Sequence, residues 1–165
     1  MTIMFQKVVM AGVGLICGSL ALDMRRRKLA KEIIGYGRGE GNLRLATRKG
    51  IIDNYFLNAE DFPAGVDLLV MGTPVGSIAP LTQAFAPKLN AGATVTDVGS
   101  VKGEIVRAMD RLLPKHVSFV AGHPIAGSEQ WGARAARANV FVCHRCIVTP
   151  TNKTDRKALQ KIAML

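Results

Sequence analysis

Aromatic and acidic residues are both scarce in this sequence. Phe, Trp and Tyr make up 5% of the 165 residues, and 12 Asp and Glu stand against 22 Lys and Arg, for a formal net charge of +10. This charge could favour nucleic acid, but the basic residues are spread along the chain and the few aromatics offer no platform for base stacking. We therefore expect no nucleic-acid partner, and an electropositive surface that attracts anionic small molecules.

A long hydrophobic run is also lacking. No stretch reaches the roughly 18 apolar residues of a membrane span, so we expect no membrane association. The apolar run after Lys7 could be a secretory signal, but Asp23 and the basic cluster at residues 25–28 follow it without a convincing cleavage site. A solvated helix end explains that cluster more simply, because cations are favoured there by the helix dipole.

Cysteine occurs three times. Cys143 and Cys146 form a C-x-x-C pair, but no second pair completes a zinc site, and we expect no metal. Residues 145–149 resemble a strand, on which a separation of three residues places the two thiols on opposite faces. We interpret them as structural cysteines in a reducing compartment and expect a cytoplasmic protein.

The most informative segment is KVVMAGVGLICGSLA (residues 7–21), where an apolar run breaks into closely spaced glycines and then resumes as an amphipathic segment. This pattern predicts a strand, a tight turn and a helix. Gly12 and Gly14 supply the first two glycines of a dinucleotide-binding fingerprint, in which bare backbone approaches a pyrophosphate at a helix N-terminus. Cys17 occupies the third position, so the motif is imperfect and weak evidence by itself.

Strand and helix patterns alternate along the rest of the chain. Strands are expected at residues 32–36, 55–57, 67–71, 93–96, 118–121 and 145–149, and helices at 15–30, 40–49, 75–86, 101–113 and 155–165, with Ser100 as the N-cap of the fourth. This order predicts a doubly wound, mostly parallel α/β sheet of the Rossmann type, as a single domain over residues 1–165. The last helix reaches Leu165 without a stop signal, so we expect a chain that was cut rather than finished.

Ligands of open parallel sheets bind outside the carboxyl ends of the strands. The residues that follow the predicted strands are Gly12 and Gly14, Gly37 and Arg38, Thr73 and Pro74, residues 97–100, and residues 122–124, and we expect one cleft to hold them all. The Gly37-Arg38 pair lies where a carboxylate would select NAD, and its arginine favours NADP instead. The alternative is that Arg38 is an ordinary surface charge.

His123 lies between glycine and proline at a predicted strand end. An imidazole titrates near neutrality and can take a proton from a hydroxyl while hydride leaves the same carbon. A core or loop histidine satisfied by backbone is an equal alternative. Ser100 is more often only a helix cap, although a cap hydroxyl at a cleft can also bind substrate, and Thr73 is more often structural.

Five segments together resemble a known family. VGLICGSLALDMRRR, EIIGYGR, VMGTPVG, TVTDVGSVKGEI and VAGHPIAGSEQWG, in that order and spacing, are similar to the N-terminal half of prephenate dehydrogenase and its relative arogenate dehydrogenase. The G-H-P-x-A-G-[ST]-E block is the specific part, and it argues against other hydroxy-acid oxidoreductases. The resemblance implies an oxidative decarboxylation of prephenate or arogenate in tyrosine biosynthesis, with hydride transfer to NAD or NADP.

The resemblance also implies roles for individual residues. His123 matches the catalytic histidine that accepts the proton of the substrate hydroxyl, Ser100 matches a serine near that hydroxyl, and Glu129 matches an acid beside the site. The cofactor-binding residues are matched by Gly12, Gly14, Leu15, Ile16, Gly37, Arg38, Thr73 and Pro74.

Two departures from the family matter. Cys17 stands where the family has its third glycine, and its sulfur is expected to push the first helix away from the pyrophosphate turn. The family also has an all-helical domain that supplies the substrate arginine and most of the dimer interface, and this sequence contains none of it. A homodimer is therefore expected only with that domain. Two functions stay open: the cofactor domain of the dehydrogenase, or an NAD(P)-binding module without turnover.

Overall fold

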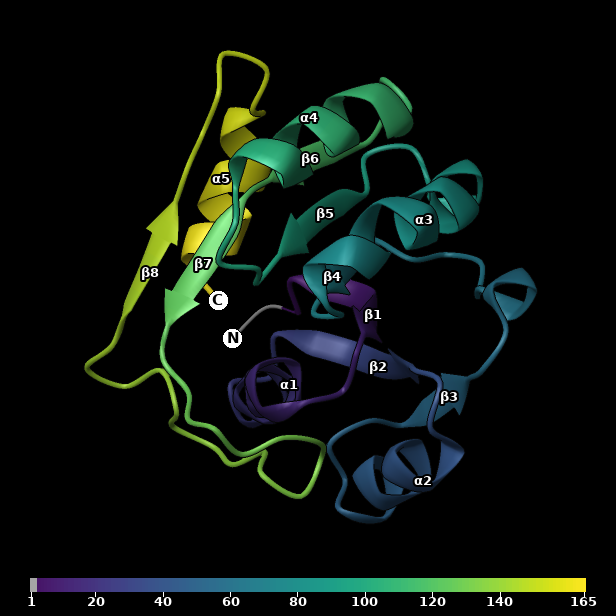
Figure 1. The fold of residues 1–165 in the computed structure, drawn as a ribbon, viewed down its shortest axis with the longest axis vertical. Helices are drawn as coiled ribbons and strands as arrows, with labels where there is room; N and C mark the ends of the chain where they lie inside the picture. The colour runs from purple at the N-terminus through teal and green to yellow at the C-terminus, as the bar shows by residue number, and fades with distance from the viewer. Residues whose placement is uncertain (1–2) are drawn as a thin grey trace.

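The computed structural model describes residues 3–165, and a six-stranded parallel sheet of order β3-β2-β1-β4-β5-β6 lies at its centre (Figure 1). The strands are β1 (Phe5–Ala11), β2 (Ala30–Tyr36), β3 (Asn54–Phe56), β4 (Leu68–Met71), β5 (Thr94–Asp97) and β6 (Ser118–Val120). The helices are α1 (Leu15–Arg26), α2 (Glu40–Arg48), α3 (Val75–Phe85), α4 (Gly103–Leu112) and α5 (Arg156–Ala163), with short 3-10 helices at Ala59–Asp61 and Ala86–Lys88. The predicted doubly wound fold is confirmed.

The strand order reverses beside β1, which pairs with β2 on one side and with β4 on the other. The chain first moves outward from β1 to β2 and β3, and then crosses back to build β4, β5 and β6 in the opposite direction. Connections leave the carboxyl ends of β1 and β4 towards opposite sides at this point, so the crevice where ligands of such sheets bind lies there.

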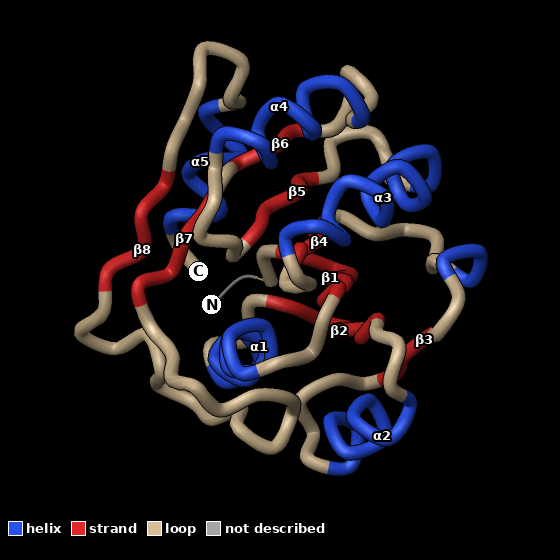
Figure 2. The backbone as a smooth tube through the Cα atoms, viewed as in Figure 1, coloured by secondary structure: helices blue, strands red, loops and turns tan. Residues whose placement is uncertain are grey.

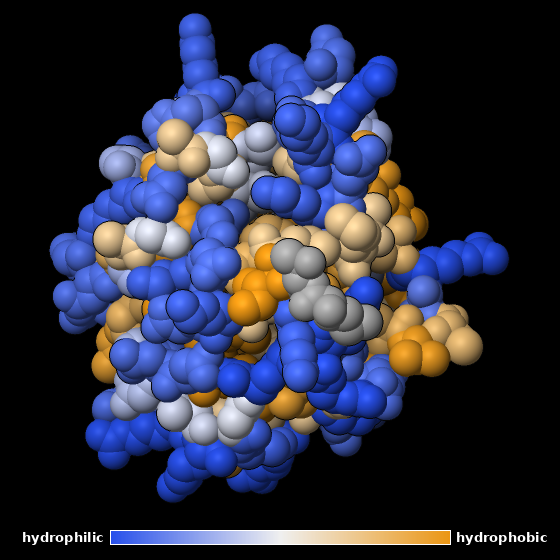
Figure 3. Space-filling model, turned by 180° about the vertical axis from the view of Figure 1, so that it is seen from behind, coloured by the Kyte–Doolittle hydropathy of each residue, from blue (hydrophilic) through white to orange (hydrophobic). Residues whose placement is uncertain are grey.

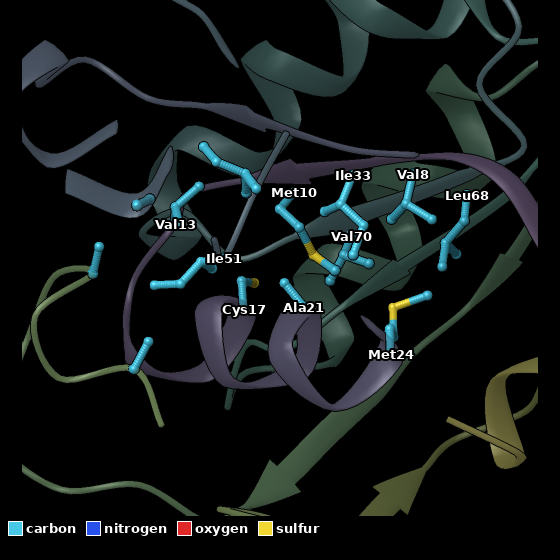
Figure 4. Packing of buried hydrophobic residues seen from close by; sticks show 14 of the residues in the cluster. Val8, Met10, Val13, Cys17, Ala21, Met24, Ile33, Ile51, Leu68 and Val70 are labelled. Atoms are coloured by element: carbon cyan, nitrogen blue, oxygen red, sulfur yellow. The ribbon is translucent and has the colours of Figure 1, made fainter. Parts of the chain in front are cut away.

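The hydrophobic core has two layers, one on each face of the sheet. Val8 and Met10 of β1 belong to the layer under α1 and α2, whereas Val9 and Ala11 belong to the layer under α3 and α4. Figure 4 shows residues of α1 turned towards the strands in the first layer (Cys17, Ala21 and Met24). Because helices cover both faces, β4 is apolar at every position and β1 is apolar over residues 8–11, which is why both are visible in the sequence as continuous apolar runs.

The first helix ends earlier than predicted. α1 stops at Arg26, and Lys28 takes a left-handed backbone conformation with φ 55°. Ala30, the predicted last residue of the helix, is the first residue of β2. A non-glycine residue at positive φ ends a helix as effectively as a glycine, but no residue type at these positions announces it.

Two further strands form a separate antiparallel pair, β7 (Gly122–Ile125) with β8 (Arg145–Val148). The strand predicted at 145–149 is therefore present, but it does not join the parallel sheet. Residues 122–124 were expected to follow a strand as a loop, and they are instead part of β7. Cys143 lies outside β8 with φ 61°, so the prediction that both thiols of the C-x-x-C pair share one strand is wrong; both cysteines are free and exposed.

The long connection between β7 and β8, residues 126–144, runs past α1 towards α2 (Figure 2). Two side chains of α1 hold it: Ser19 Oγ accepts the N–H of Arg137 at 3.2 Å, and the Asp23 carboxylate accepts the N–H of Asn139 at 3.0 and 3.2 Å. A Cβ on Gly18 would lie 2.7 Å from the Cβ of Ala136. The connection therefore packs closely on the side of α1 that faces away from the sheet.

The surface seen from behind is mostly hydrophilic, with small hydrophobic areas between the charged side chains (Figure 3). Among residues 3–165, none of the helices has the length and apolar character needed to cross a membrane. In the same part of the chain, no three His, Cys, Asp or Glu side chains come together as a metal site.

Candidate functional site

A cavity of about 620 Å³, here called the turn cavity, opens where β1, β2 and β4 end. Its lining includes six of the residues that the sequence assigned to cofactor binding (Gly12, Gly14, Gly37, Arg38, Thr73 and Pro74). The other two, Leu15 and Ile16, line an adjoining cavity that also contacts Gly14. The structure thus brings together, around one turn, residues that lie up to 62 positions apart in the sequence.

The turn itself depends on the two glycines in different ways. Gly12 has φ +95°, and a Cβ there would lie 2.7 Å from the carbonyl oxygen of Gly72, so a side chain is excluded both by conformation and by space. Gly14 meets nothing within 4 Å of where its Cβ would be. Its lack of a side chain therefore leaves the backbone open to whatever occupies the cavity.

The N-terminus of α1 is built to accept an anion. Gly14 is the N-cap and makes no side-chain hydrogen bond, and the first turn contains no acidic residue. The first backbone N–H groups of a helix have no partner inside the helix, and together with the helix dipole they favour negative charge. A pyrophosphate is consequently a chemical match for this end of the cavity.

Cys17 is accommodated by a glycine on the neighbouring strand end. The side chain is 1% exposed, and a Cβ on Gly72 would lie only 2.1 Å from Cys17 Sγ. The space for the sulfur comes from Gly72, and α1 still begins directly after the turn at Leu15. Burial, and to a smaller extent the charge of Asp97, raises the pKa of the Cys17 thiol to about 12, so the thiol is neutral and adds no negative charge beside the anion site.

We expect Gly72→Ala to lower the free energy of unfolding by about 1–3 kcal/mol, because the new methyl group overpacks against the Cys17 sulfur. The double variant Cys17→Ala/Gly72→Ala should recover most of that loss, since the next nearest atoms to the new Cβ are Gly12 O at 3.3 Å and Cys17 Cβ at 3.4 Å. Urea unfolding of wild type, both single variants and the double variant gives the coupling. An equal cost of Gly72→Ala with and without the sulfur would contradict this packing.

Asn42 on α2 fixes the turn to the long β7–β8 connection. Its Nδ2 donates to the carbonyl of Val13 at 2.9 Å, and its Oδ1 accepts the N–H of Ala133 at 2.7 Å. One amide side chain therefore satisfies backbone groups on both sides of the cavity. This role is not visible in the sequence, because an isolated asparagine in a helix has no spacing pattern that points to a distant turn.

Asp97 and Lys102 form a buried ion pair at the end of β5. Asp97 is 1% exposed, and its carboxylate also accepts the N–H groups of Gly99 at 3.0 Å and Gly122 at 3.3 Å. Lys102 Nζ donates in addition to the carbonyl of Gly122. Burial raises the pKa of Asp97, and the hydrogen bond and charge of Lys102 partly oppose that rise. The pair holds the residue that precedes His123.

The proposed catalytic residues lie on three separate segments. His123 is half-buried in β7, where it pairs with Ile147 of β8. Gly122 and Pro124 line a cavity of about 370 Å³, and because alternate residues of a strand face opposite sides, His123 faces away from that cavity. His123 is not among the residues that line the turn cavity. That one cleft holds all the strand-end residues stays a prediction.

Ser100 and Glu129 are both exposed. Ser100 lies in the loop between β5 and α4, and the prediction that it caps this helix is wrong, because α4 begins at Gly103 with Lys102 as its N-cap and no side-chain cap. The side chain of Lys102 turns inward to Asp97 instead of capping the helix. Glu129 lies in the β7–β8 connection and lines a cavity beside the turn cavity.

Arg38 follows β2 by two residues and is exposed at the mouth of the turn cavity. Its guanidinium forms no ion pair with any residue in the part of the chain that the structure describes. The next carboxylate along the chain, Glu40, accepts hydrogen bonds from Arg44 at 2.9 and 3.1 Å and from Tyr55 at 3.1 Å. The hydrogen bond with Arg44 is the main reason that the pKa of Glu40 is lowered. The cation at this end of the cavity is thus free and the carboxylate is occupied.

Residues 20–165 match the family model described as the nucleotide-binding domain of prephenate dehydrogenase. This chain belongs to that family. The prephenate dehydrogenase of Bacillus subtilis (strain 168) is 34% identical to it over 162 residues, which are 96% of this chain and 43% of the relative. The family resemblance read from the sequence is confirmed.

Solved structures of family members have the same fold. The A. aeolicus prephenate dehydrogenase in complex with hydroxyphenyl propionate and NAD+ superimposes with a TM-score of 0.88 at 36% identity, over 96% of this chain and 55% of that one. The Synechocystis arogenate dehydrogenase gives a TM-score of 0.84 at 31% identity, over 96% and 55%. The chain therefore spans about half the length of these prephenate dehydrogenase family members.

Proposed function

We propose that this chain is the dinucleotide-binding half of a prephenate or arogenate dehydrogenase, which oxidatively decarboxylates its substrate with NAD or NADP as hydride acceptor. The observation that carries the proposal is the turn cavity. It combines a turn with glycine at positions 12 and 14, a helix N-terminus open to an anion and a free cation, and these are the chemical requirements of a dinucleotide phosphate.

The residues of the cavity would hold the cofactor in a defined direction. Gly12, Gly14 and the first N–H groups of α1 would bind the pyrophosphate, with Leu15 and Ile16 beside it. Arg38 would bind the adenosine ribose, and its unpaired guanidinium suits a 2′-phosphate. Thr73 and Pro74 at the end of β4 would then lie on the nicotinamide side. The open space in front of Gly14 supports this fit, because a side chain there would fill the approach to the backbone.

When bound here, a nicotinamide dinucleotide would supply the hydride acceptor for oxidation of the hydroxyl-bearing ring carbon of the substrate, whose ring carboxylate would be lost as CO2 as the ring becomes aromatic. In this proposal His123 accepts the hydroxyl proton, Ser100 contacts the same hydroxyl, and Glu129 lies beside the site. The buried Asp97–Lys102 pair supports this assignment of His123, because it fixes the backbone immediately before the imidazole.

A second function has its own support. The chain spans 43% of the Bacillus subtilis relative and 55% of the A. aeolicus structure. An NAD(P)-binding module without turnover is therefore the alternative proposal. The two differ in one result, because only the dehydrogenase would reduce the dinucleotide when prephenate or arogenate is added.

The deciding experiment is a calorimetric titration of the chain with NADP and with NAD at two salt concentrations. We expect saturable binding that persists at the higher salt concentration, since a specific site is less screened than general attraction to a protein of net charge +10. Binding that disappears with salt would reduce the proposal to non-specific attraction. Absence of binding for both dinucleotides would contradict both proposed functions.

Arg38→Ala should raise the Kd for NADP by about tenfold and leave the Kd for NAD within about twofold, because a charge-assisted hydrogen bond to the 2′-phosphate is lost. Arg48→Ala is the matched control: Arg48 is an exposed arginine at the end of α2 and does not line the turn cavity. Titration of both variants separates a specific contact from net charge. If the two dinucleotides lose affinity equally in Arg38→Ala, Arg38 is not a phosphate ligand.

A further inference from the structure

Trp131 is the single tryptophan of the chain, and 87% of its surface is exposed. Such exposure is unusual for the largest apolar side chain, which is buried in most folds. The residue nevertheless lines the turn cavity, the adjoining cavity at Leu15, and the cavity of Glu129. Its indole therefore lies where these three cavities meet, next to the proposed pyrophosphate site.

The backbone that follows Trp131 in the chain, residues 132–134, is held by contacts with α2 and with Lys49. Gly132 has φ +77°, and a Cβ there would lie 2.9 Å from Asn42 Oδ1. The backbone therefore passes so close to Asn42 that a side chain at position 132 would collide with it. Ala133 is fully buried and donates its N–H to Asn42, while Lys49 Nζ donates to the carbonyls of Ala133 and Arg134, both at 3.3 Å. Anchoring begins directly after the tryptophan.

Asn42 also connects this segment to the glycine turn, because its Nδ2 donates a second hydrogen bond to the carbonyl of Val13. One asparagine side chain therefore ties the segment after Trp131 to the turn, in addition to the contacts of Lys49 with the same segment. A large aromatic ring that is held at a cavity mouth but uncovered by protein has its contact surface available for a ligand.

We propose that Trp131 is a dinucleotide-binding residue, whose indole packs over the cofactor in the turn cavity and shields it from water. The proposal rests on the proposed function, in that it requires a dinucleotide in this cavity. Tryptophan suits the task because its ring offers a large flat surface at a small cost in side-chain entropy. The contact is independent of the 2′-phosphate, so it should strengthen the binding of NAD and NADP alike.

The test compares three variants with wild type by calorimetric titration of the chain with NADH and NADPH. Trp131→Ala should raise both Kd values by about tenfold, and Trp131→Phe by less than about threefold, because a smaller ring keeps part of the stacking. Val142→Ala is the control, since Val142 lies in the same connection, is 60% exposed and does not line the turn cavity. The Val142→Ala variant should bind NADH and NADPH with the Kd values of wild type.

A second measurement reports position rather than affinity. Because Trp131 is the single tryptophan, quenching of its emission by energy transfer to a bound reduced nicotinamide is a direct sign that the two are close. Unchanged Kd values in Trp131→Ala, with wild type binding normally, would overturn the inference alone. Failure of wild type to bind either dinucleotide would instead overturn the proposed function, and the inference with it.

Discussion

Lys102→Met is expected to lower the free energy of unfolding by about 3–5 kcal/mol at neutral pH, because it leaves a buried carboxylate without its cationic partner. Asp97 is 1% exposed and would keep only the N–H groups of Gly99 and Gly122. The carbonyl of Gly122 would lose its donor in the same step. Lys102→Met therefore removes the contacts with both Asp97 and Gly122 from a site that is almost fully shielded from solvent.

The cost of Lys102→Met should depend on pH in a defined direction. Burial already raises the pKa of Asp97 in the folded protein, so its contribution to stability is present at low pH and is lost as pH rises through that pKa. Removing Lys102 takes away the main opposing effect and raises the pKa further. The difference from wild type should therefore be small near about pH 4 and grow towards about pH 8, which urea unfolding at several pH values measures.

The matched control is Lys153→Met, which breaks an ion pair of Lys153 with Asp110 at 3.0 Å whose side chains are 66% and 35% exposed. An exposed pair of this kind is worth less than about 1 kcal/mol. Equal losses in the two variants, or a loss in Lys102→Met that does not change with pH, would show that Asp97 is not the group that the lysine neutralises.

His123→Asn is expected to reduce the rate of prephenate-dependent reduction of the dinucleotide by about 10²–10⁴-fold, the usual worth of a general base. Asparagine keeps hydrogen-bonding capacity but cannot accept the hydroxyl proton. Since His123 does not line the turn cavity, the Kd for the dinucleotide should stay within about twofold of wild type. A loss confined to turnover is what distinguishes a proton acceptor from a structural histidine.

The rates are best measured on this chain and, in parallel, on the chain joined to the C-terminal half of the Bacillus subtilis relative. His116→Asn serves as the control, because His116 is exposed in the turn before β6. Full activity in His123→Asn would remove the imidazole from the mechanism. A matching loss of dinucleotide affinity would point instead to a disturbed β7–β8 pair.

The sequence predicts the parallel sheet well because its signals are local. β4 is apolar at every position since both faces of the sheet are covered, and the glycine turn announces α1. β7 was not predicted because Gly122 and Pro124 are turn-forming residues, and the segment becomes a strand through pairing with β8, which begins twenty-three positions after Gly122. Its conformation is thus decided by a partner and not by its own composition.

The residues of the candidate site also differ in whether a local sequence pattern indicates them. Gly12, Gly14 and Arg38 could be predicted as candidates because the chemistry of a dinucleotide requires those residue types at that spacing, and the structure places them around one cavity. The sequence does not indicate that Asn42 and Trp131 lie beside them, because these positions follow from contacts between α2 and the β7–β8 connection, 91 residues apart in the case of Asn42 and Ala133. No periodicity or short motif carries information over that distance.

The packing of the β7–β8 connection on α1 also sets the order in which this protein can be completed during synthesis. The hydrogen-bond partners of Ser19 and Asp23 lie 118 and 116 residues further along the chain. While the ribosome adds those residues, the outer side of the first helix stays bare and the carbonyl of Val13 lacks the asparagine link to Ala133. The glycine turn therefore reaches its final form only after residues 133–139 have been added to the chain.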